Sequence, residues 1–377
     1  MKGTLGIVFA LALLAPPLRA AGGADPYGFL LLDSNARAAA LGGAYTALGS
    51  GAGVLAYNSA GLARTERDEV NFMHNQYFQG ITQEYLNYAS PSGLGASVNY
   101  LSFGDVPQTT VNNQTGTGLG DTTLSDLSLG VGYGRRLTED LSVGGGAKYI
   151  RETIDQTPRD NVAFDLGAHY VIPWLRGLSV GAAVLNMGPT VTYDQASENQ
   201  PLTWRLGGAY QRDWLGASHA LALDVVKERN DSAYVSVGVE TRVLKVLALR
   251  LGYNQSNDAG VGITAGIGVR VHDFDFDYAI VPFGTLGYSN RASVGYRWGG
   301  PTAKTPPAAK ASPVPAIVPA APSAAVPAAA AAKPSEPQTL MIANPSATAP
   351  VISPVVSSGT ILVPSAPAPQ PTSPSRP

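Results

Sequence analysis

Residues 127–135, Leu-Ser-Leu-Gly-Val-Gly-Tyr-Gly-Arg, indicate the fold most plainly, because large apolar residues alternate with small ones along the stretch. Successive side chains of a β-strand point to opposite faces, so Leu, Val and Tyr share one face while Ser and Gly share the other. Residues 261–271 repeat the scheme, with Val, Ile and Ala opposite Gly, Thr and Arg. This period of two predicts strands with one apolar face.

The same alternation extends on both sides of these stretches, from residue 69 to residue 298, and predicts fourteen strands. They are expected at residues 70–79, 82–89, 94–103, 127–136, 141–152, 162–171, 177–186, 203–212, 218–228, 233–242, 246–254, 261–271, 273–281 and 287–298. Most are close to the ~9–11 residues with which a tilted strand crosses a bilayer, and the number of strands is even.

The links between the predicted strands alternate in length. Those after even-numbered strands are short, at residues 91–93, 137–140, 173–176, 213–217, 244–245 and 272. Several after odd-numbered strands are long and polar, at residues 104–126, 153–161 and 187–202, although the first link, 80–81, is tight. Outer-membrane barrels combine short periplasmic turns with longer external loops. We therefore predict an all-β fold, a transmembrane antiparallel β-barrel of about 14 strands.

Composition supports export to a membrane. Charged residues make up 14% of the 377, against the roughly 25% of soluble domains, and the net charge of −2 gives no reason to expect a nucleic-acid partner. The absence of cysteine excludes disulfides and thiolate metal sites. From residue 25 onward, no charge-free apolar run approaches the roughly 18 residues of a membrane helix, which leaves a closed barrel as the way to span a bilayer.

Four segments are expected. Residues 1–24 resemble a signal peptide, with Lys2 before a short apolar stretch and small residues at its end. Residues 25–68 form an N-terminal hatch or plug, and residues 69–300 form the barrel. Residues 301–377 are rich in Pro and Ala and are expected to be a disordered tail. An even strand count places both termini on the periplasmic side; the tail is either a spacer that reaches partners or an inert extension.

If the apolar faces contact lipid, the opposite faces line the lumen. Charged or titratable residues predicted there are Lys148, Asp165, His169, Arg205, Asp224, Glu240, Arg250, Arg270, Asp273, Asp275, Asp277, Arg291 and Arg297. Two interpretations stay open: a polar pore or binding wall, or a lattice of ion pairs that holds a plugged lumen shut.

Residues 273–277, Asp-Phe-Asp-Phe-Asp, suggest calcium, but same-face residues of a strand are about 6.6–6.8 Å apart, too far to share an ion at about 2.3–2.6 Å. No metal site or cofactor is therefore predicted.

Inner-face glycines either admit a plug close to the wall or relieve curvature of the sheet. They lie at residues 130, 132, 134, 144, 146, 262, 266 and 268. The four scattered histidines form no catalytic motif, so no enzyme is predicted.

The hatch carries two motifs, Arg-Ala-Ala-Ala-Leu-Gly-Gly-Ala at residues 37–44 and Asn-Ser-Ala-Gly-Leu at residues 58–62. They resemble the R-x-x-x-x-G-G-A and N-P-A-G-L motifs of PorV/PorQ-type proteins, within the FadL-like superfamily. Ser59 stands in place of the proline, and residues 48–51 replace the usual acidic pair. The matching hatch residues are Arg37, Gly42, Gly43, Ala44, Asn58, Ser59 (at the proline position), Ala60, Gly61 and Leu62.

The resemblance implies a bacterial outer-membrane protein with a hatch inside a fourteen-stranded barrel. A PorV-like role would be a binding, scaffold or secretion-associated component of the envelope, with protein partners at the tail or the external loops. The alternative is a FadL-like transporter of hydrophobic small molecules, with such a compound as ligand. In both cases the surrounding partner is outer-membrane lipid.

Overall fold

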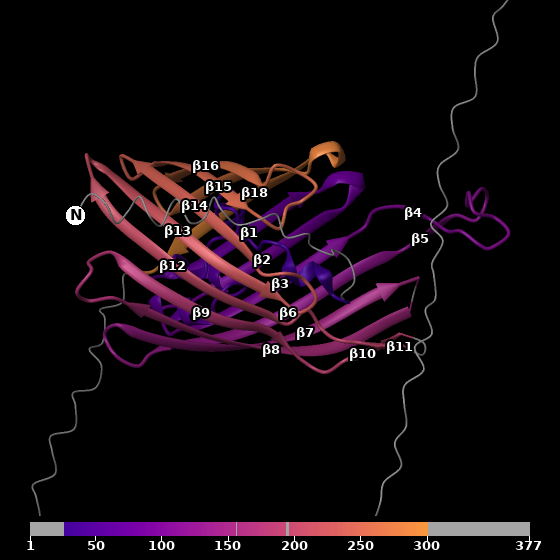
Figure 1. The fold of residues 1–377 in the computed structure, drawn as a ribbon, viewed down its shortest axis with the longest axis horizontal. Coiled ribbons are helices and arrows are strands. Elements are labelled where there is room, and N and C mark those ends of the chain that lie inside the picture. The colour runs from indigo at the N-terminus through magenta and orange to yellow at the C-terminus, as the bar shows by residue number, and fades with distance from the viewer. Residues whose placement is uncertain (1–25, 156, 194–195, 301–377) are drawn as a thin grey trace, which may run out of the picture. The chain divides into compact units, whose positions relative to one another are not determined.

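The computed structural model describes residues 26–155, 157–193 and 196–300, which form a closed antiparallel barrel around the N-terminal segment (Figure 1). The predicted fold class is confirmed. The expected signal peptide and Pro/Ala-rich tail lie outside the described residues. The fourteen barrel strands are β1 (Asp68–Gln76), β2 (Thr82–Ala89), β3 (Leu94–Ser102), β6 (Leu124–Arg136), β7 (Leu141–Ile154), β8 (Thr157–Val171), β9 (Leu178–Met187), β12 (Thr203–Trp214), β13 (Ala217–Glu228), β14 (Tyr234–Val243), β15 (Leu247–Asn254), β16 (Ile263–Val271), β17 (Phe274–Pro282) and β18 (Tyr288–Trp298).

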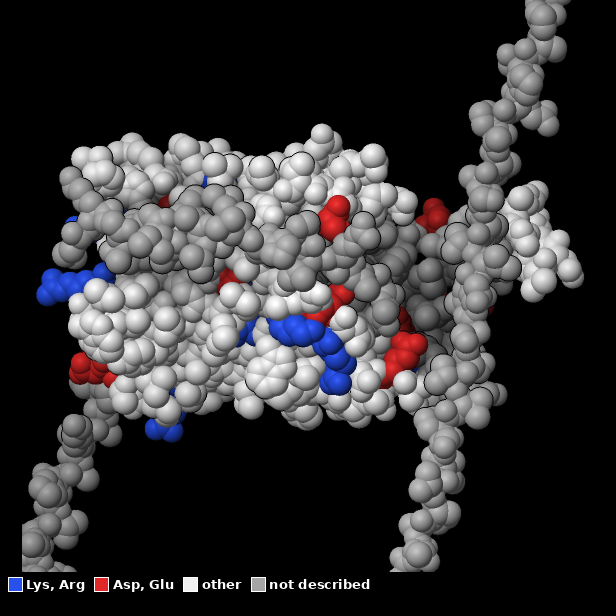
Figure 2. All heavy atoms as spheres, viewed as in Figure 1, with Lys and Arg blue, Asp and Glu red and all other residues white. Residues whose placement is uncertain are grey.

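Each strand pairs with the barrel strands before and after it in the chain, and β1 pairs with β18 to close the sheet. Closure leaves no free sheet edge, which is the condition for a β-structure in hydrocarbon. The outward face is apolar: on β6, Leu129, Val131 and Tyr133 are exposed, while the glycines between them are buried. Most of the wall visible in Figure 2 is correspondingly free of charged side chains.

The two ends of the barrel differ. At the short-turn end, β1 begins, β18 ends and the links after even-numbered barrel strands are tight. At the long-link end, two links carry small hairpins of their own, β4 (Val106–Pro107) with β5 (Asp121–Thr122), and β10 (Val191–Tyr193) with β11 (Ala196–Glu198). Figure 1 shows the β4–β5 segment extending past the barrel at that end.

One predicted link is wrong. Residues 153–161 were expected to be a loop, but β7 extends to Ile154 and β8 begins at Thr157, and these two residues pair. The polar composition of this stretch marks a hairpin that continues beyond the apolar band, where both faces can contact water. Arg151 and Asp160 form an ion pair of 2.6 Å on facing strands there. Polarity therefore marked the edge of the apolar band and not the end of the strands.

The N-terminal segment fills the lumen as a chain of short helices. These are η1 (Gly28–Leu31), α2 (Ala36–Ala40), η2 (Ala52–Val54) and η3 (Ser59–Arg64). Helix α2 packs on the inner faces of β15 to β18, and η3 packs on β6, β7 and β8. We call residues 26–67 the hatch. No helix among the described residues is long and apolar enough to cross a membrane.

Candidate functional site: the hatch and the lumen wall

The α2 end of the hatch is tied to the wall by full charges. Asn35 caps the helix, its side chain accepting a hydrogen bond of 2.8 Å from Ala38 N. Arg37 then donates through two nitrogens to the carboxylate of Glu240 at 2.8 and 2.9 Å. This paired geometry is the strong form of a guanidinium–carboxylate contact, and Glu240 is nearly fully buried. The predicted motif arginine thus docks α2 onto β14.

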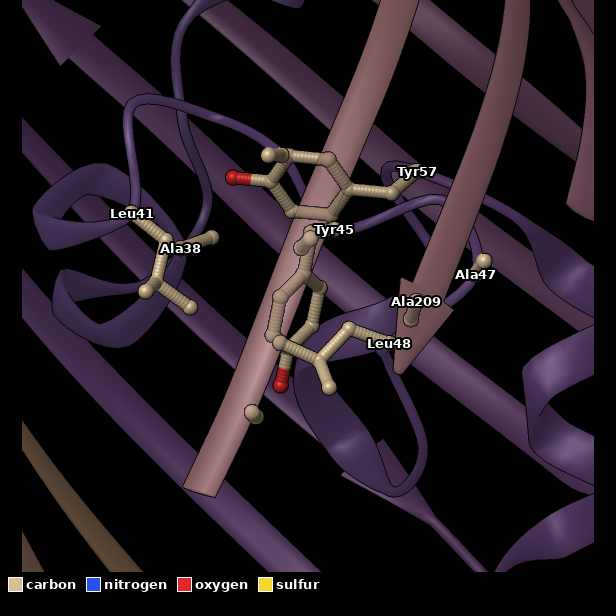
Figure 3. Close-up of a cluster of buried hydrophobic side chains, with 10 residues drawn as sticks. Ala38, Leu41, Tyr45, Ala47, Leu48, Tyr57 and Ala209 are labelled. Atoms are coloured by element: carbon tan, nitrogen blue, oxygen red, sulfur yellow. The ribbon is translucent and has the colours of Figure 1, made fainter. Parts of the chain in front are cut away.

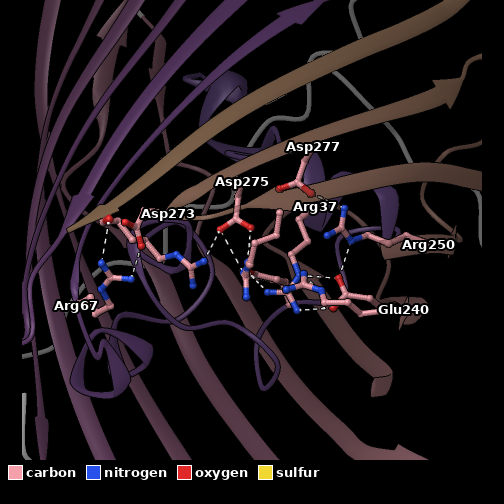
Figure 4. A network of polar contacts seen from close by, with 11 residues as sticks. Arg37, Arg67, Glu240, Arg250, Asp273, Asp275 and Asp277 are labelled. Atoms are coloured by element: carbon pink, nitrogen blue, oxygen red, sulfur yellow. Dashed lines mark hydrogen bonds and ion pairs between the residues drawn. The ribbon is translucent and has the colours of Figure 1, made fainter. Parts of the chain in front are cut away.

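Glu240 also forms an ion pair with Arg250 at 2.6 Å, and Arg250 forms one with Asp277 at 2.7 Å. Figure 4 shows this row of alternating charges running along the wall beside the hatch. Each buried charge has an opposite neighbour, which is the condition for tolerating it inside a barrel. Of the two interpretations of the lumen charges, the ion-pair lattice describes this part of the wall.

The Asp-Phe-Asp-Phe-Asp stretch continues the same lattice. Asp273 pairs with Arg67 of the hatch at 2.7 Å, and Asp275 pairs with Arg270 and Arg297 at 2.6 and 3.3 Å. Each carboxylate of the stretch therefore has its own arginine. Among the residues described, no group of three or more His, Asp or Glu side chains is arranged to hold a metal ion.

A second tie lies at the middle of the hatch, on Asp224 of β13. One carboxylate oxygen accepts hydrogen bonds from Tyr45 N, Thr46 N and the Thr46 hydroxyl, at 3.0, 3.0 and 2.6 Å. Arg205 pairs with that oxygen at 3.0 Å and also donates to Gly43 O at 2.6 Å. This wall carboxylate therefore serves as the acceptor for a turn of the hatch.

Two hatch tyrosines form the centre of an apolar cluster beside this tie. The rings of Tyr45 and Tyr57 meet edge to face, with centroids 5.2 Å apart (Figure 3). The Tyr57 hydroxyl donates to Asp33 at 2.8 Å, and Asp33 also pairs with Arg291 of β18. Burial raises the pKa of both phenols, in Tyr57 reinforced by Asp33, so both hydroxyls remain protonated.

The η3 end of the hatch rests on the wall through backbone contact. The Asn58 amide donates to Thr46 O and to Ala168 O of β8, both at 2.9 Å, while its oxygen accepts from Ala60 N at 3.1 Å. Asn58 is thus helix cap and wall contact at once. Beneath it, a Cβ added at Gly144 would lie 2.5 Å from Ala60 N. Here there is no room for any side chain.

The inner-face glycines divide between the two uses considered from the sequence. At residues 132, 134, 144 and 266, the nearest atom to an added Cβ belongs to the hatch. At 130, 146, 262 and 268 the nearest atoms belong to the wall itself. Further glycines that face the hatch, at 95, 167, 181, 207, 238 and 252, were not identified from the sequence. Glycine on the wall therefore lets the hatch approach the backbone of the barrel closely.

The remaining predicted residues are placed as follows. The motif residues Gly42, Gly43, Ala44, Ser59, Ala60, Gly61 and Leu62 are buried within or beneath the hatch. Gly42 has φ +66 and lies against Tyr253, where a Cβ would be 2.5 Å from the carbonyl oxygen, so only glycine fits. Lys148 pairs with Asp165 at 2.9 Å and donates to Asn186 at 2.7 Å, and both partners belong to the wall.

Several residues of the site were missed at the level of sequence. Asp33, Tyr45, Thr46 and Tyr57 all join the hatch to charges of the wall. Asp33 offered a signal, since it is the one carboxylate between residues 26 and 65 in a stretch otherwise poor in charge. The tyrosines and the threonine offered none, because their partners lie far away in the chain.

The long-link end of the lumen holds an apolar cluster. Tyr27 and Phe29 of the hatch are buried against Leu101, Ile150 and Val191. Val191 belongs to the link that carries β10, so this link turns down onto the hatch. Within the same link Gln200 is buried and donates to Val162 O at 2.9 Å. The apolar space at this end is thus occupied by the chain's own side chains.

Comparison with known proteins agrees with this architecture. Residues 20–153 match the uncharacterised protein family UPF0164, and no curated protein matches the sequence. Among solved structures, the monoaromatic hydrocarbon channel CymD is similar with a TM-score of 0.50 at 12% identity, over 71% of this chain and 97% of that one. The Pseudomonas putida toluene transporter TodX gives 0.48 at 14% identity, over 70% and 96%. A Pseudomonas aeruginosa FadL homologue gives 0.44 at 11% identity, over 71% and 98%.

The fold is therefore a closed fourteen-stranded antiparallel barrel, similar to that of the hydrocarbon channel CymD. At these identities the likeness concerns the fold. The closer resemblance to PorV/PorQ-type proteins stays a prediction that rests on the two hatch motifs.

Proposed function

We propose that this protein is an outer-membrane barrel that serves as a binding or scaffold component of the bacterial envelope, in the manner of PorV/PorQ-type proteins. The observation that carries the proposal is the way the hatch is held. Three hatch features, Arg37, the turn at Thr46 and Asp33, each contact a buried charge of the wall. Such contacts hold the hatch inside the lumen, so they are expected of a barrel that stays closed and not of one that conducts continuously.

The strength of these ties favours a closed resting state. Removing one partner of a buried pair is destabilising by about 3–5 kcal/mol, and the ties lie on different strands, so they would have to separate together. An opening by thermal fluctuation alone would therefore be rare. A closed barrel can still present its ends to other molecules.

The β4–β5 link offers the surface for a partner. It extends past the barrel rim, and Val111 in it is 92% exposed. The other long link lies on the barrel, since Val191 packs with Tyr27 and Phe29 of the hatch and Gln200 is buried against β8. We therefore assign partner binding to residues 103–123, and a lumen cover to residues 188–193 and 196–202.

Co-purification from gently solubilised native membranes tests this assignment. The full chain should recover a stable set of envelope proteins, and replacing residues 108–117 by Gly and Ser should remove them. The same kind of replacement at residues 256–261, in the link between β15 and β16, should leave recovery unchanged. Repeated recovery of the barrel alone would contradict a scaffold role.

A second candidate is transport of hydrophobic small molecules, favoured by the apolar cluster around Tyr27 and Phe29. Withdrawal of this segment would expose an apolar space at the long-link end. The test is binding of a monoaromatic hydrocarbon to the purified chain, compared with Phe29→Ser. Saturable binding that weakens in the variant would support transport, whereas no binding to either chain would remove this candidate.

A further inference from the structure

A cavity of about 500 Å³ opens at the short-turn end, between the last turn of the hatch and the wall. Its wall side includes Arg136, Ser142 and His169, which are direct neighbours across β6, β7 and β8. Its hatch side includes Arg64 and Thr65, at the end of η3. The cavity is therefore built half by the hatch and half by the barrel.

Two guanidinium groups of this cavity have no carboxylate partner among the residues that the structure describes. Arg136 donates to Ala63 O at 3.1 Å, and Arg64 lies against the ring of His169. The Arg64 guanidinium contacts both ring nitrogens of His169, and His169 Nε2 also lies 3.0 Å from Ala47 O. Burial, and then the charge of Arg136, lower the pKa of Arg64. Two like charges thus share one enclosed space.

A buried hydroxyl of this cavity also lacks a partner. Thr65 is 8% exposed, and its Oγ1 has no hydrogen-bond partner in the structure. A buried hydroxyl without a partner costs free energy, which a bound acceptor would recover. Such an acceptor would also offset the repulsion between the two arginines.

The other charges that line the cavity have partners or lie at its rim. Arg67 and Arg297 pair with carboxylates of the wall, and Glu69 accepts a hydrogen bond from Ala52 N at 3.3 Å. Glu66 and Glu139 are exposed, and Asp140 belongs to the β6–β7 turn beside them. Water therefore screens the rim carboxylates more strongly than the half-buried arginines.

We propose that the cavity is a binding site for an oxyanion, a phosphate or a carboxylate, held by Arg64, Arg136 and the hydroxyl of Thr65. Guanidinium groups bind such anions through paired, charge-assisted hydrogen bonds. Because the site takes one arginine from each body, the bound anion joins the hatch to the barrel.

Isothermal titration of the detergent-solubilised full chain with inorganic phosphate, and separately with acetate, tests the site. Saturable binding of at least one anion is expected. Arg136→Gln should weaken it about tenfold or more, since it removes a charged donor, and Thr65→Val should weaken it less. Arg136→Lys should recover part of the affinity. Arg135→Gln, one residue away on the outward face, is the matched control and should bind like the unaltered chain.

A soluble short-chain phosphatidic acid separates the two sources of phosphate. Tighter binding than inorganic phosphate assigns the site to a lipid headgroup, and weaker binding assigns it to a free anion. Binding of none of the three probes would overturn the proposal. So would equal loss in Arg135→Gln and Arg136→Gln, because the two variants differ only in the face from which charge is removed.

Discussion

The two ends of the hatch are held in different ways. Helix α2 is fixed by full charges, through Arg37 on Glu240. Helix η3 itself makes no ion pair with a carboxylate of the wall among the described residues, and lies instead against glycines such as Gly144, with Asn58 bonded to the backbone of β8. The charged contact that follows it, Arg67 with Asp273, is exposed. Both ends pack on glycine, but only the α2 end is held by an ion pair with a buried carboxylate.

This difference predicts how each end of the hatch would separate from the wall. A charged tie is strong but exchangeable, because a competing ion or a neighbouring side chain can take over the released partner. A backbone surface packed on glycine has no replacement partner and loses its contacts at once when it separates. We therefore expect substitutions at the α2 end to act through charge, and those at the η3 end to act through shape.

The largest effect is expected from Glu240→Gln, which leaves Arg37 without its buried partner. Loss of one member of a buried pair should lower the free energy of unfolding by about 3–5 kcal/mol. Urea unfolding in detergent micelles measures it. Glu84→Gln, in a half-exposed pair with His74, is the control and should change the value by less than about 1 kcal/mol. Equal effects would show that burial of the α2 tie is unimportant.

Next come Arg37→Ala and Asn58→Ala, one at each end. The first removes the charged tie, and the second removes a helix cap and two bonds to buried carbonyls, for a loss of about 1–3 kcal/mol per unsatisfied group. Both should loosen the hatch and raise the permeability of the barrel to small solutes, measured by liposome swelling. Unchanged permeability in both variants would refute their sealing role.

A smaller effect is expected from Gly144→Ala, which tests shape without changing charge. The added Cβ would meet the backbone of η3, and overpacking of this kind typically costs about 1–3 kcal/mol. Gly145→Ala is the matched control, because its Cβ would lie 3.5 Å from the nearest atom, at an ordinary contact distance. Urea midpoints of the pair should differ; identical midpoints would mean that the hatch adjusts freely.

The smallest effect concerns the exposed pair of Arg67 and Asp273. The hydrogen bond from Arg67 lowers the pKa of Asp273, so the pair stabilises the fold at neutral pH and is lost as pH falls below the ordinary aspartate value of about 3.9. Asp273→Asn should slightly lower the midpoint of urea unfolding at neutral pH. The midpoint should then change less as the pH is lowered. A larger loss of stability in Asp273→Asn than in Glu240→Gln would show that the exposed pair holds the hatch more strongly than the buried one.

The barrel could be predicted from sequence because its determinant is local. Lipid contacts every second residue, so Leu129, Val131 and Tyr133 reveal their strand without knowledge of any partner. The extended β7–β8 hairpin was missed because residues beyond the apolar band lose that alternation.

The site was less predictable because its contacts join distant parts of the chain. Arg37 and Asn58 were found through motifs, but Asp224 accepts hydrogen bonds from Thr46, 178 residues away, and nothing local indicates this. Likewise Gly144 and Gly146 are both predicted on the inner face, although only the first lies beneath the hatch.

The most direct test of a lumen closed by its own hatch is conductance in planar lipid bilayers. The full chain should show no sustained conductance, whereas a refolded variant without residues 35–64, with unchanged β-content by circular dichroism, should conduct steadily. Equal steady conductance from both proteins would contradict the account.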